Sequence, residues 1–200
     1  MNFSIIKDEY KKRKKEIKSR LKEFKKTKDH FYELCFCILT PQSNAYKCDE
    51  CVKVLKERHF SKKEIKLNDI LKKYTRFHNN KSKYLIRIKE NHPEMINTLN
   101  QIEKPDEKRE YLVKNVKGLG LKEASHYLRN IGCEGLAILD RHILKNLKKL
   151  NVIKEIPLTI SKKTYLEIEI KFKEFSKKIG IPMDELDLLF WSMETGKVFK

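Results

Sequence analysis

The sequence predicts an all-α fold. Apolar residues recur every three or four positions through most of the 200-residue chain, which is the period of an amphipathic helix. No segment alternates apolar and polar residues in the way of a half-buried strand. Between two helical patterns, Gly118 and Gly120 flank Leu119 and indicate a tight turn, because glycine adopts positive φ angles without steric cost. We therefore expect a helix, a hairpin and a helix within a wholly helical protein of one domain, or two closely joined ones.

Three helices are expected in the first part of the chain. From Asn2 to Lys26, apolar residues recur among lysines and predict an amphipathic helix with a basic outer face. The segment from Asp29 to Leu39 is much more apolar and predicts a buried helix with Asp29 as its cap. Thr40-Pro41 should end it, because the residue before proline is disfavoured in helical geometry. A further helix is expected from Ala45 to Arg58.

The middle of the chain predicts shorter helices. Ser61 to Tyr74 opens with a Ser-x-x-Glu capping box before an apolar pattern, which predicts a helix. The segment from Arg76 to Lys81 interrupts the pattern and leads into another helix, so Asn80 and Lys81 lie near a helix start. Free amides and lysines at such a start suit a phosphate, and a solvated basic turn is the alternative. His92-Pro93 is expected to begin a separate helix that runs to Leu99.

The helices after residue 100 have clear start and stop signals. Pro105 should begin the helix that leads into the hairpin, Lys122 should open the helix after it, and Gly132 should end that helix. Asp140 can cap the next helix. Three helices complete the chain: Arg141 to Leu150, a basic amphipathic helix that ends at Lys178, and an apolar helix from Met183 to Met193 that carries Asp187 and Trp191.

The charge balance indicates a polyanionic partner. The formal net charge is +18, from 46 Lys and Arg against 28 Asp and Glu, so nucleic acid is the default partner. The alternative is a lysine-rich composition that reflects genome bias or a hot habitat. Glutamate does not keep pace with lysine here, which favours nucleic acid. No apolar run is long enough to span a bilayer, and Met1 to Lys18 lacks the apolar core of a signal peptide, so we expect an intracellular protein.

The five cysteines do not predict a disulfide framework or a metal site. An odd number does not suit extracellular pairing. Cys35 and Cys37 lie among apolar residues, as buried thiols often do. Cys48 and Cys51 have a ligand-like spacing, but a single pair is a weak zinc signal. No closely spaced run of four cysteines suggests an iron–sulfur cluster, and we expect plain thiols.

The segment around the hairpin is the only one that reads as a chemical site. A lysine amine is a nucleophile only when it is neutral, and the positive end of a helix disfavours an ammonium at Lys122. Asp140 could return to the same place and assist as a carboxylate. The alternative, which spacing alone does not exclude, is a surface lysine and a simple N-cap. Gln42 lies at a helix-to-helix corner, where capping is the simpler interpretation.

The residues that carry these features resemble a known family. The segments KGLGLKEASHYLRNIG and LAILDRH are similar to the helix–hairpin–helix and following loop of the DNA glycosylase superfamily that includes endonuclease III. The nearest resemblance is to the type-2 8-oxoguanine DNA glycosylase/lyase family of archaea and some bacteria. It extends to CILTPQSNA, RFHNNKSKYL and the tail DLLFWSMETGKVFK. It implies two helical subdomains with the active-site cleft between them, approximately 30–135 with the hairpin at 116–122, and 1–29 plus 136–200.

The resemblance implies a role for each candidate residue. Lys122 would attack C1′ of the damaged nucleotide and form a Schiff base, Asp140 would support the positive sugar, and strand cleavage by β-elimination would follow. Because the base must leave the stack, Gln42 would fill the gap. Trp191 would stack on the flipped base, with Phe77 a weaker candidate for its other face. The terminal carboxylate or main chain of Lys200 would accept a hydrogen bond from N7–H of 8-oxoguanine.

The expected partner is double-stranded DNA containing 8-oxoguanine, bound by a monomer that uses no cofactor and no membrane. Amides at Gly118 and Gly120 would grip a phosphate, and the resemblance allows a monovalent cation at the hairpin carbonyls. Two other functions stay open. The enzyme could act on another oxidised base, or the chain could be a non-enzymatic helix–hairpin–helix DNA-binding module.

Overall fold

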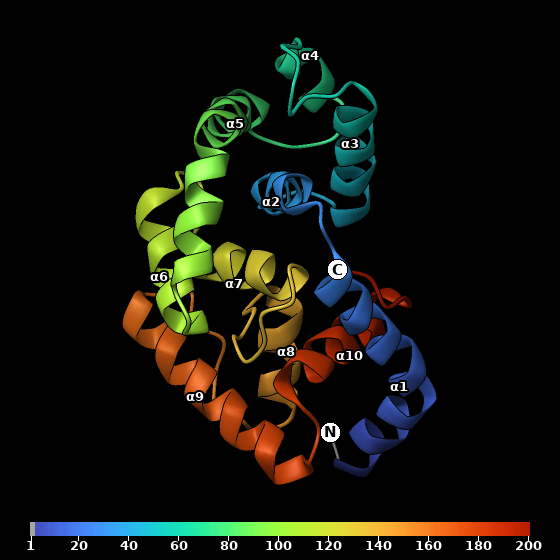
Figure 1. Cartoon of the computed structure of the whole chain (residues 1–200). Helices are drawn as coiled ribbons and strands as arrows, with labels where there is room; N and C mark the ends of the chain where they lie inside the picture. The colour runs from blue at the N-terminus through green and yellow to red at the C-terminus, as the bar shows by residue number, and fades with distance from the viewer. Residues whose placement is uncertain (1–2) are drawn as a thin grey trace. The chain divides into compact units, whose positions relative to one another are not determined.

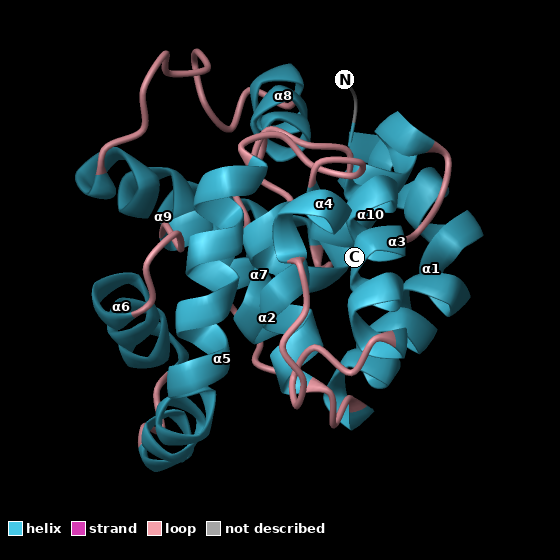
Figure 2. Ribbon diagram, turned by 90° about the horizontal axis from the view of Figure 1, so that it is seen from above, coloured by secondary structure: helices cyan, strands magenta, loops and turns pink. Residues whose placement is uncertain are grey.

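The structure is a computed structural model that describes residues 3–200, and within them every regular element is a helix (Figure 2). The all-α prediction is confirmed. The chain forms two compact units, one made of the N-terminal segment up to Thr27 with Leu128–Lys200, the other of Lys28–Tyr127. The second boundary lies inside a helix, whereas the sequence placed it near residue 135. In order, the helices are α1 Phe3–Lys26, α2 His30–Leu39, α3 Ala45–Glu57, α4 Leu67–Leu71, α5 His78–Gln101, α6 Pro105–Asn115, α7 Leu121–Asn130, α8 Arg141–Lys149, α9 Lys162–Ile179 and α10 Met183–Thr195.

The unit that contains both ends of the chain is built on α10. Helices α1, α8 and α9 all pack against it (Figure 1). Ile6 and Ile17 of α1 are fully buried, and the lysines of this helix face outward as its period predicts. The Phe172 and Phe190 rings of α9 and α10 stack with centroids 6.1 Å apart. The expected start of α1 at Asn2 lies outside the described residues.

The other unit is built on α2, which is buried on almost every side. Helices α3 and α5 pack against α2, and α4 packs against α5. Cys35, Cys37, Cys48 and Cys51 lie in this core, and none of the cysteines forms a disulfide in the described part of the chain. Burial raises the pKa of Cys48 to about 11 and that of Cys51 to about 12, so these side chains stay thiols at neutral pH.

Two helix predictions in the middle of the chain are wrong. Ser61 to Tyr74 forms only the short helix α4, because the Ser61 hydroxyl contacts the Tyr32 hydroxyl (3.2 Å) instead of capping a helix. Pro93 does not begin a helix but lies inside α5. Its ring is on the exposed side, where the carbonyl left without an amide partner can bind water, while the buried Ile88 and Met95 hold the helix on either side.

The expected cap at Asp29 is also wrong in detail. Asp29 occupies the N-cap position of α2, but its side chain makes no capping hydrogen bond. Its carboxylate pairs with the Lys56 ammonium of α3 instead. The neighbouring cap is regular, since the Asn44 side chain accepts from the Lys47 amide (3.1 Å) and starts α3.

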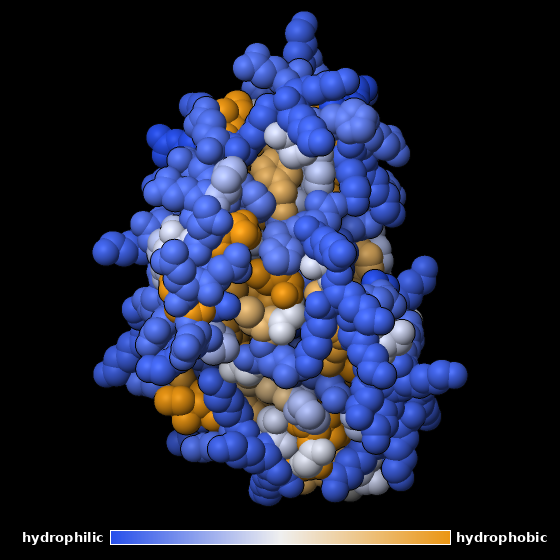
Figure 3. All heavy atoms as spheres, in the orientation of Figure 1, coloured by the Kyte–Doolittle hydropathy of each residue, from blue (hydrophilic) through white to orange (hydrophobic). Residues whose placement is uncertain are grey.

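The surface agrees with the composition. Hydrophilic residues cover most of the face shown in Figure 3, with small apolar areas between them. Among the helices of residues 3–200, none is both long enough and apolar enough to cross a membrane.

Candidate active site

The hairpin joins α6 to α7 and requires glycine at one position. Gly118 has a φ of +97°, and a Cβ there would lie 2.6 Å from Cδ2 of Tyr84, so a side chain is excluded by both conformation and space. Leu119 is buried and anchors the turn, while Gly118 and Gly120 are exposed. The Leu119 amide donates to the Val116 carbonyl (3.2 Å). A monovalent cation bound at that carbonyl would therefore share it with an amide.

Lys122 is the second residue of α7, directly after the hairpin. Its side chain is 31% exposed, and its Nζ lies 2.9 Å from Oε1 of Glu123. The sequence pointed to the helix N-terminus as the influence on this amine. The structure adds a second influence, the carboxylate of Glu123. The Gly120 carbonyl accepts from the Ala124 amide (2.9 Å), so the helical hydrogen bonds of α7 begin directly before Lys122 and Glu123.

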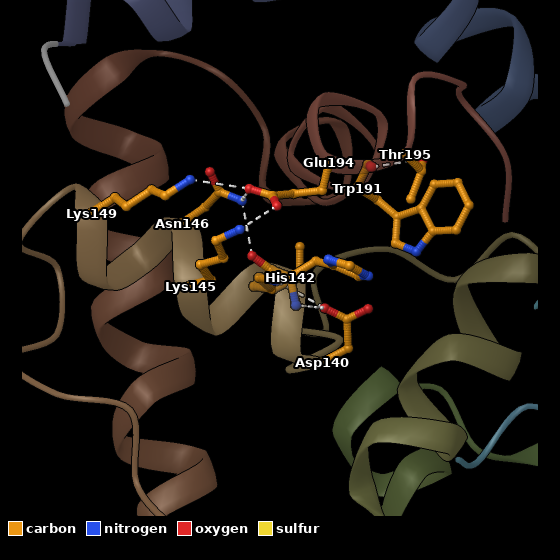
Figure 4. Close-up of polar contacts among 9 residues, drawn as sticks. Asp140, His142, Lys145, Asn146, Lys149, Trp191, Glu194 and Thr195 are labelled. Carbon is orange, nitrogen blue, oxygen red and sulfur yellow. Dashed lines mark hydrogen bonds and ion pairs between the residues drawn. The ribbon is translucent and has the colours of Figure 1, made fainter. Parts of the chain in front are cut away.

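Asp140 caps α8 with only one of its two carboxylate oxygens. Oδ1 accepts from the amides of His142 and Ile143, both at 2.8 Å. Oδ2 points away from the helix (Figure 4). The N-cap interpretation is thus correct, but the cap uses only Oδ1 and leaves Oδ2 of the same side chain outside it. Capping and chemistry are compatible at this residue.

The segment before Asp140 is fixed by buried polar groups of α9. The Ala137 amide donates to Oε1 of Glu169 (2.7 Å), and the Tyr165 hydroxyl donates to the Ala137 carbonyl (2.6 Å). This backbone has no helical partner, so the side chains of α9 satisfy its hydrogen bonds. Asp140 therefore follows a segment that hydrogen bonds hold in place, and not a loose loop.

Trp191 of α10 is half-buried and belongs to a small aromatic group. The His142 ring meets it edge-on with centroids 6.5 Å apart and planes at 80°, and Figure 4 draws both side chains. The Phe199 ring lies 5.7 Å from it. Because the residue is of intermediate burial, Trp191 does not belong to the fully buried core. Lys200 is half-buried at the end of the same tail.

The end of α10 is held by an ion cluster that the sequence did not reveal. Glu194 pairs with Lys145 (2.6 Å) and Lys149 (3.2 Å) of α8 (Figure 4). Its hydrogen bond to Lys145 is the main reason that the pKa of this carboxyl is lowered to about 2. Glu194 lies one helical turn after Trp191, so the cluster orients the helix end that carries the indole.

A second interaction missed from the sequence is a buried ion pair. Nη1 of Arg129 lies 2.9 Å from Oδ2 of Asp187, and the two side chains are 2% and 11% exposed. The Phe24 ring lies 4.9 Å from the guanidinium. Burial raises the pKa of Asp187 to about 7, an effect that Arg129 opposes. The aspartate within the apolar α10 is a signal that can be read from the sequence, but nothing in the sequence identifies its partner.

Gln42 and Phe77 share an unusual backbone. Their φ angles are +54° and +57°, the left-handed region that few side chains adopt. Both are exposed, Phe77 by 52%, and the Arg76 guanidinium lies 5.4 Å from the Phe77 ring. The capping interpretation of Gln42 is wrong, because Asn44 caps α3. Both side chains instead project from strained positions, which persist only where the surroundings enforce them.

The expected phosphate contacts at the start of α5 differ from each other. Asn80 is exposed, as a DNA contact requires. Lys81 is 4% exposed, and its Nζ donates to four oxygens of its own unit. The prediction of Lys81 as a phosphate contact is therefore wrong. One signal was available: Lys81 shares a helix face with the buried Leu85 and Ile88, at offsets of four and seven.

These features define a helix–hairpin–helix DNA glycosylase by class, with a lysine after the glycine hairpin and a helix-capping aspartate further on. The comparisons give the family. Residues 10–181 match the family model described as 8-oxoguanine DNA glycosylase, and the chain belongs to that family.

Relatives and solved structures agree over nearly the whole chain. An 8-oxoguanine DNA glycosylase/AP lyase of Fusobacterium nucleatum is 46% identical over 99% of this chain and 97% of its own length. One of Methanocaldococcus jannaschii is 38% identical over 92% and 91%. The solved M. jannaschii 8-oxoguanine glycosylase/lyase in complex with a 15mer DNA containing 8-oxoguanine has a TM-score of 0.89 at 36% identity, and covers 98% of this chain and all of that one. The Thermotoga maritima 8-oxoguanine DNA glycosylase also reaches 0.89, at 32% identity over 99% and 98%.

Proposed function

We propose that this protein removes 8-oxoguanine from duplex DNA and cleaves the abasic strand that results. The observation that carries the proposal is the match to relatives named 8-oxoguanine DNA glycosylase/AP lyase along nearly their full length, in a chain that presents a lysine directly after the hairpin. A hairpin alone would serve a DNA-binding module equally well. The protein would act inside the cell, as a monomer.

Lys122 is assigned the nucleophile. Its neutral amine attacks C1′ of the damaged nucleotide, the N-glycosidic bond breaks, and the base leaves with that electron pair. Loss of a proton from nitrogen and ring opening of the sugar give a Schiff base. Removal of a C2′ proton then expels the 3′ phosphate by β-elimination. The ammonium that pairs with Glu123 at 2.9 Å must first lose a proton to become this amine, which also ends the ion pair.

Asp140 is assigned the carboxylate that stabilises the sugar as it becomes positive. Only its Oδ1 is used by the cap of α8, so Oδ2 can face the substrate without a cost to the helix. A carboxylate held by two amides keeps a fixed direction, which is what electrostatic stabilisation of a transition state requires.

The damaged base would be read by the other candidates. The nucleotide must rotate out of the duplex before C1′ is accessible. The half-buried Trp191 would stack on the base, and Phe77 is the second stacking candidate. Lys200 would supply the acceptor for N7–H, through its terminal carboxylate or main chain. Gln42, exposed at its corner, would fill the gap in the stack.

The duplex itself would be held mainly through phosphates. Amides at Gly118 and Gly120 and the exposed Asn80 are the assigned contacts. The net charge of +18 makes most of the affinity ionic, so binding should weaken steeply as salt rises.

Borohydride trapping tests the proposal. Reduction of the Schiff base should leave a covalent adduct between the protein and a duplex that contains 8-oxoguanine. Lys122→Gln should abolish the adduct. DNA binding should fall by less than about tenfold, because the substitution removes only one positive charge near the DNA phosphates. Lys114→Gln removes the same charge from an exposed residue of α6 and should leave trapping intact. An adduct that survives Lys122→Gln would remove this lysine from its role, and no adduct from the unmodified protein on any oxidised base would overturn the activity.

A further inference from the structure

Lys81 lies in a cage of neutral oxygens. Its Nζ is 2.7 Å from the Leu39 carbonyl, 2.8 Å from the Pro41 carbonyl, 3.1 Å from Oγ of Ser43 and 2.7 Å from Oγ1 of Thr75. Leu39 is the last residue of α2, and a cation is favourable beside the carbonyls that end a helix. The next two belong to the corner between α2 and α3, and Thr75 belongs to the turn before α5.

The cage joins two of the left-handed positions of this unit. Gln42, with a φ of +54°, stands between Pro41 and Ser43, both of which accept from the ammonium. Phe77, with a φ of +57°, follows Thr75 by two residues, and its carbonyl accepts from the Lys81 amide (3.0 Å). One side chain therefore binds on both sides of the corner and on the turn as well.

Further hydrogen bonds connect the corner to the turn directly. Oγ of Ser43 lies 2.9 Å from Oγ1 of Thr75 and accepts from the Arg76 amide (3.0 Å). Oγ1 of Thr75 also donates to the Leu39 carbonyl (2.8 Å). The same hydroxyls contact the ammonium, so these bonds form a single network whose centre is Nζ of Lys81.

Burial by itself disfavours the charged form of Lys81. Desolvation lowers the pKa of Lys81 to about 8. An apolar side chain would avoid that penalty, but it could donate to none of the four oxygens. The ammonium, with three hydrogens, suits a network that fixes backbone oxygens, whereas a neutral amine has only two hydrogens to donate.

We propose that Lys81 is a positioning residue for lesion recognition, which locks the corner that carries Gln42 to the turn that carries Phe77. Both exposed side chains then project in fixed directions from left-handed positions that the chain would otherwise leave. The inference rests on the proposed function for its consequence in DNA repair, but the locking itself is a property of the free protein.

Hydrogen exchange of the free protein tests the locking. In Lys81→Met, which keeps most of the side-chain length, the amides of Ser43 and Arg76 should exchange at least about tenfold faster. The Cys48 amide of α3, bonded to the Asn44 carbonyl (3.0 Å), should change little. Lys53→Met makes the same substitution at an exposed lysine of α3 and should leave both corner amides as they are. Unchanged exchange at Ser43 and Arg76 in Lys81→Met would overturn the inference.

A double-mutant cycle tests the consequence. Lys81→Met should slow single-turnover excision of 8-oxoguanine from a duplex by about 10- to 100-fold, the size expected from a misplacement near 1 Å. In the Gln42→Ala/Phe77→Ala background the same substitution should have almost no further effect, because the side chains that it positions are gone. Cleavage at a preformed abasic site in single-stranded DNA, where no stack has to be filled, should stay within about twofold.

The outcomes separate the inference from the function on which it rests. An equal loss in both backgrounds would mean that Lys81 only stabilises the fold, and would overturn the positioning role. A loss of single-strand cleavage as large as the loss of excision would do the same. If the unmodified protein excised no 8-oxoguanine, the proposed function would fail, and exchange at Ser43 and Arg76 would still decide whether Lys81 locks the corner.

Discussion

The two units hold a buried cation in opposite ways. In one, the Arg129 guanidinium faces a carboxylate, Asp187, at 2.9 Å. In the other, the Lys81 ammonium faces carbonyl and hydroxyl oxygens, which carry no formal charge. The first arrangement neutralises the charge and joins α7 to α10. The second leaves the charge in place and gathers backbone oxygens around it.

The two arrangements respond to different changes, one to the loss of a partner and the other to a change of protonation. An ion pair is most sensitive to the loss of one partner, because a buried charge then remains alone. A cage of neutral oxygens loses hydrogen bonds one at a time and is more sensitive to the protonation of its centre. The first device suits a fixed joint between helices, and the second suits the control of local backbone geometry.

The largest effect is expected from breaking the ion pair. Asp187→Asn should lower the free energy of unfolding by about 3–5 kcal/mol, because the Arg129 guanidinium stays buried without its carboxylate. Urea denaturation at pH 8 measures it. Asp8→Asn is the matched control, since Asp8 is exposed and 4.0 Å from Lys11, and it should cost below about 0.5 kcal/mol.

A double substitution sharpens this test. Arg129→Met with Asp187→Leu removes both charges and should be less destabilising than Asp187→Asn alone. If Asp187→Asn cost no more than Asp8→Asn, the pair would not be the joint described here.

The sequence could predict the parts of the fold that local chemistry determines. Pro105 begins α6, and Gly118 and Gly132 adopt φ angles of +97° and +93° at the turn and after α7, as their start, turn and stop signals predict. The error at Ser61 arises because the side chain that takes its hydroxyl, Tyr32, is 29 residues away. A capping box states a local preference, and a distant partner can override it.

The candidate site could be predicted as residue types but not as contacts. Lys122 and Asp140 follow from the hairpin and the cap, and the resemblance supplied their roles, which remain predictions. The ion pair of Lys122 with Glu123 and the four oxygens around Lys81 could not be predicted from spacing, since each depends on how a side chain is directed. The left-handed φ of Gln42 had no sequence signal, because glutamine rarely adopts it.

The second effect in size is a pH dependence that belongs to the cage. The pKa of Lys81 falls from 10.5 to about 8 on folding, with burial the main cause and Cys48, Lys122, Arg76 and Glu123 the other groups that influence it. The folded protein thus binds fewer protons than the unfolded chain between these values, so the stability contributed by this group is lost as pH falls through 8 and regained toward 10.5.

The measurement is the free energy of unfolding at pH 7.5 and at pH 10, for the unmodified protein and for Lys81→Met. The difference between the two should move in favour of the unmodified protein by at most ~3 kcal/mol as pH rises, from ~1.4 kcal/mol for each pKa unit. A difference that does not vary with pH would show that the cage holds its charge as firmly as an ion pair does.

The smallest effect is expected at the exposed cluster of Glu194, which is a third arrangement. Its partners Lys145 and Lys149 are 51% and 41% exposed, so water and salt screen the attraction, and Glu194→Gln should cost below about 1 kcal/mol. Because folding lowers the pKa of Glu194 from 4.5 to about 2, its contribution to the free energy of unfolding is complete above pH 4.5. That contribution is lost as pH falls through 2. Repeating the denaturation in 1 M NaCl should remove most of the cost, whereas the cost of Asp187→Asn should persist because that pair is buried. If both costs responded equally to salt, burial would not be what distinguishes these ion pairs, and the contrast between Arg129 and Lys81 would have to rest on the chemistry of their partners alone.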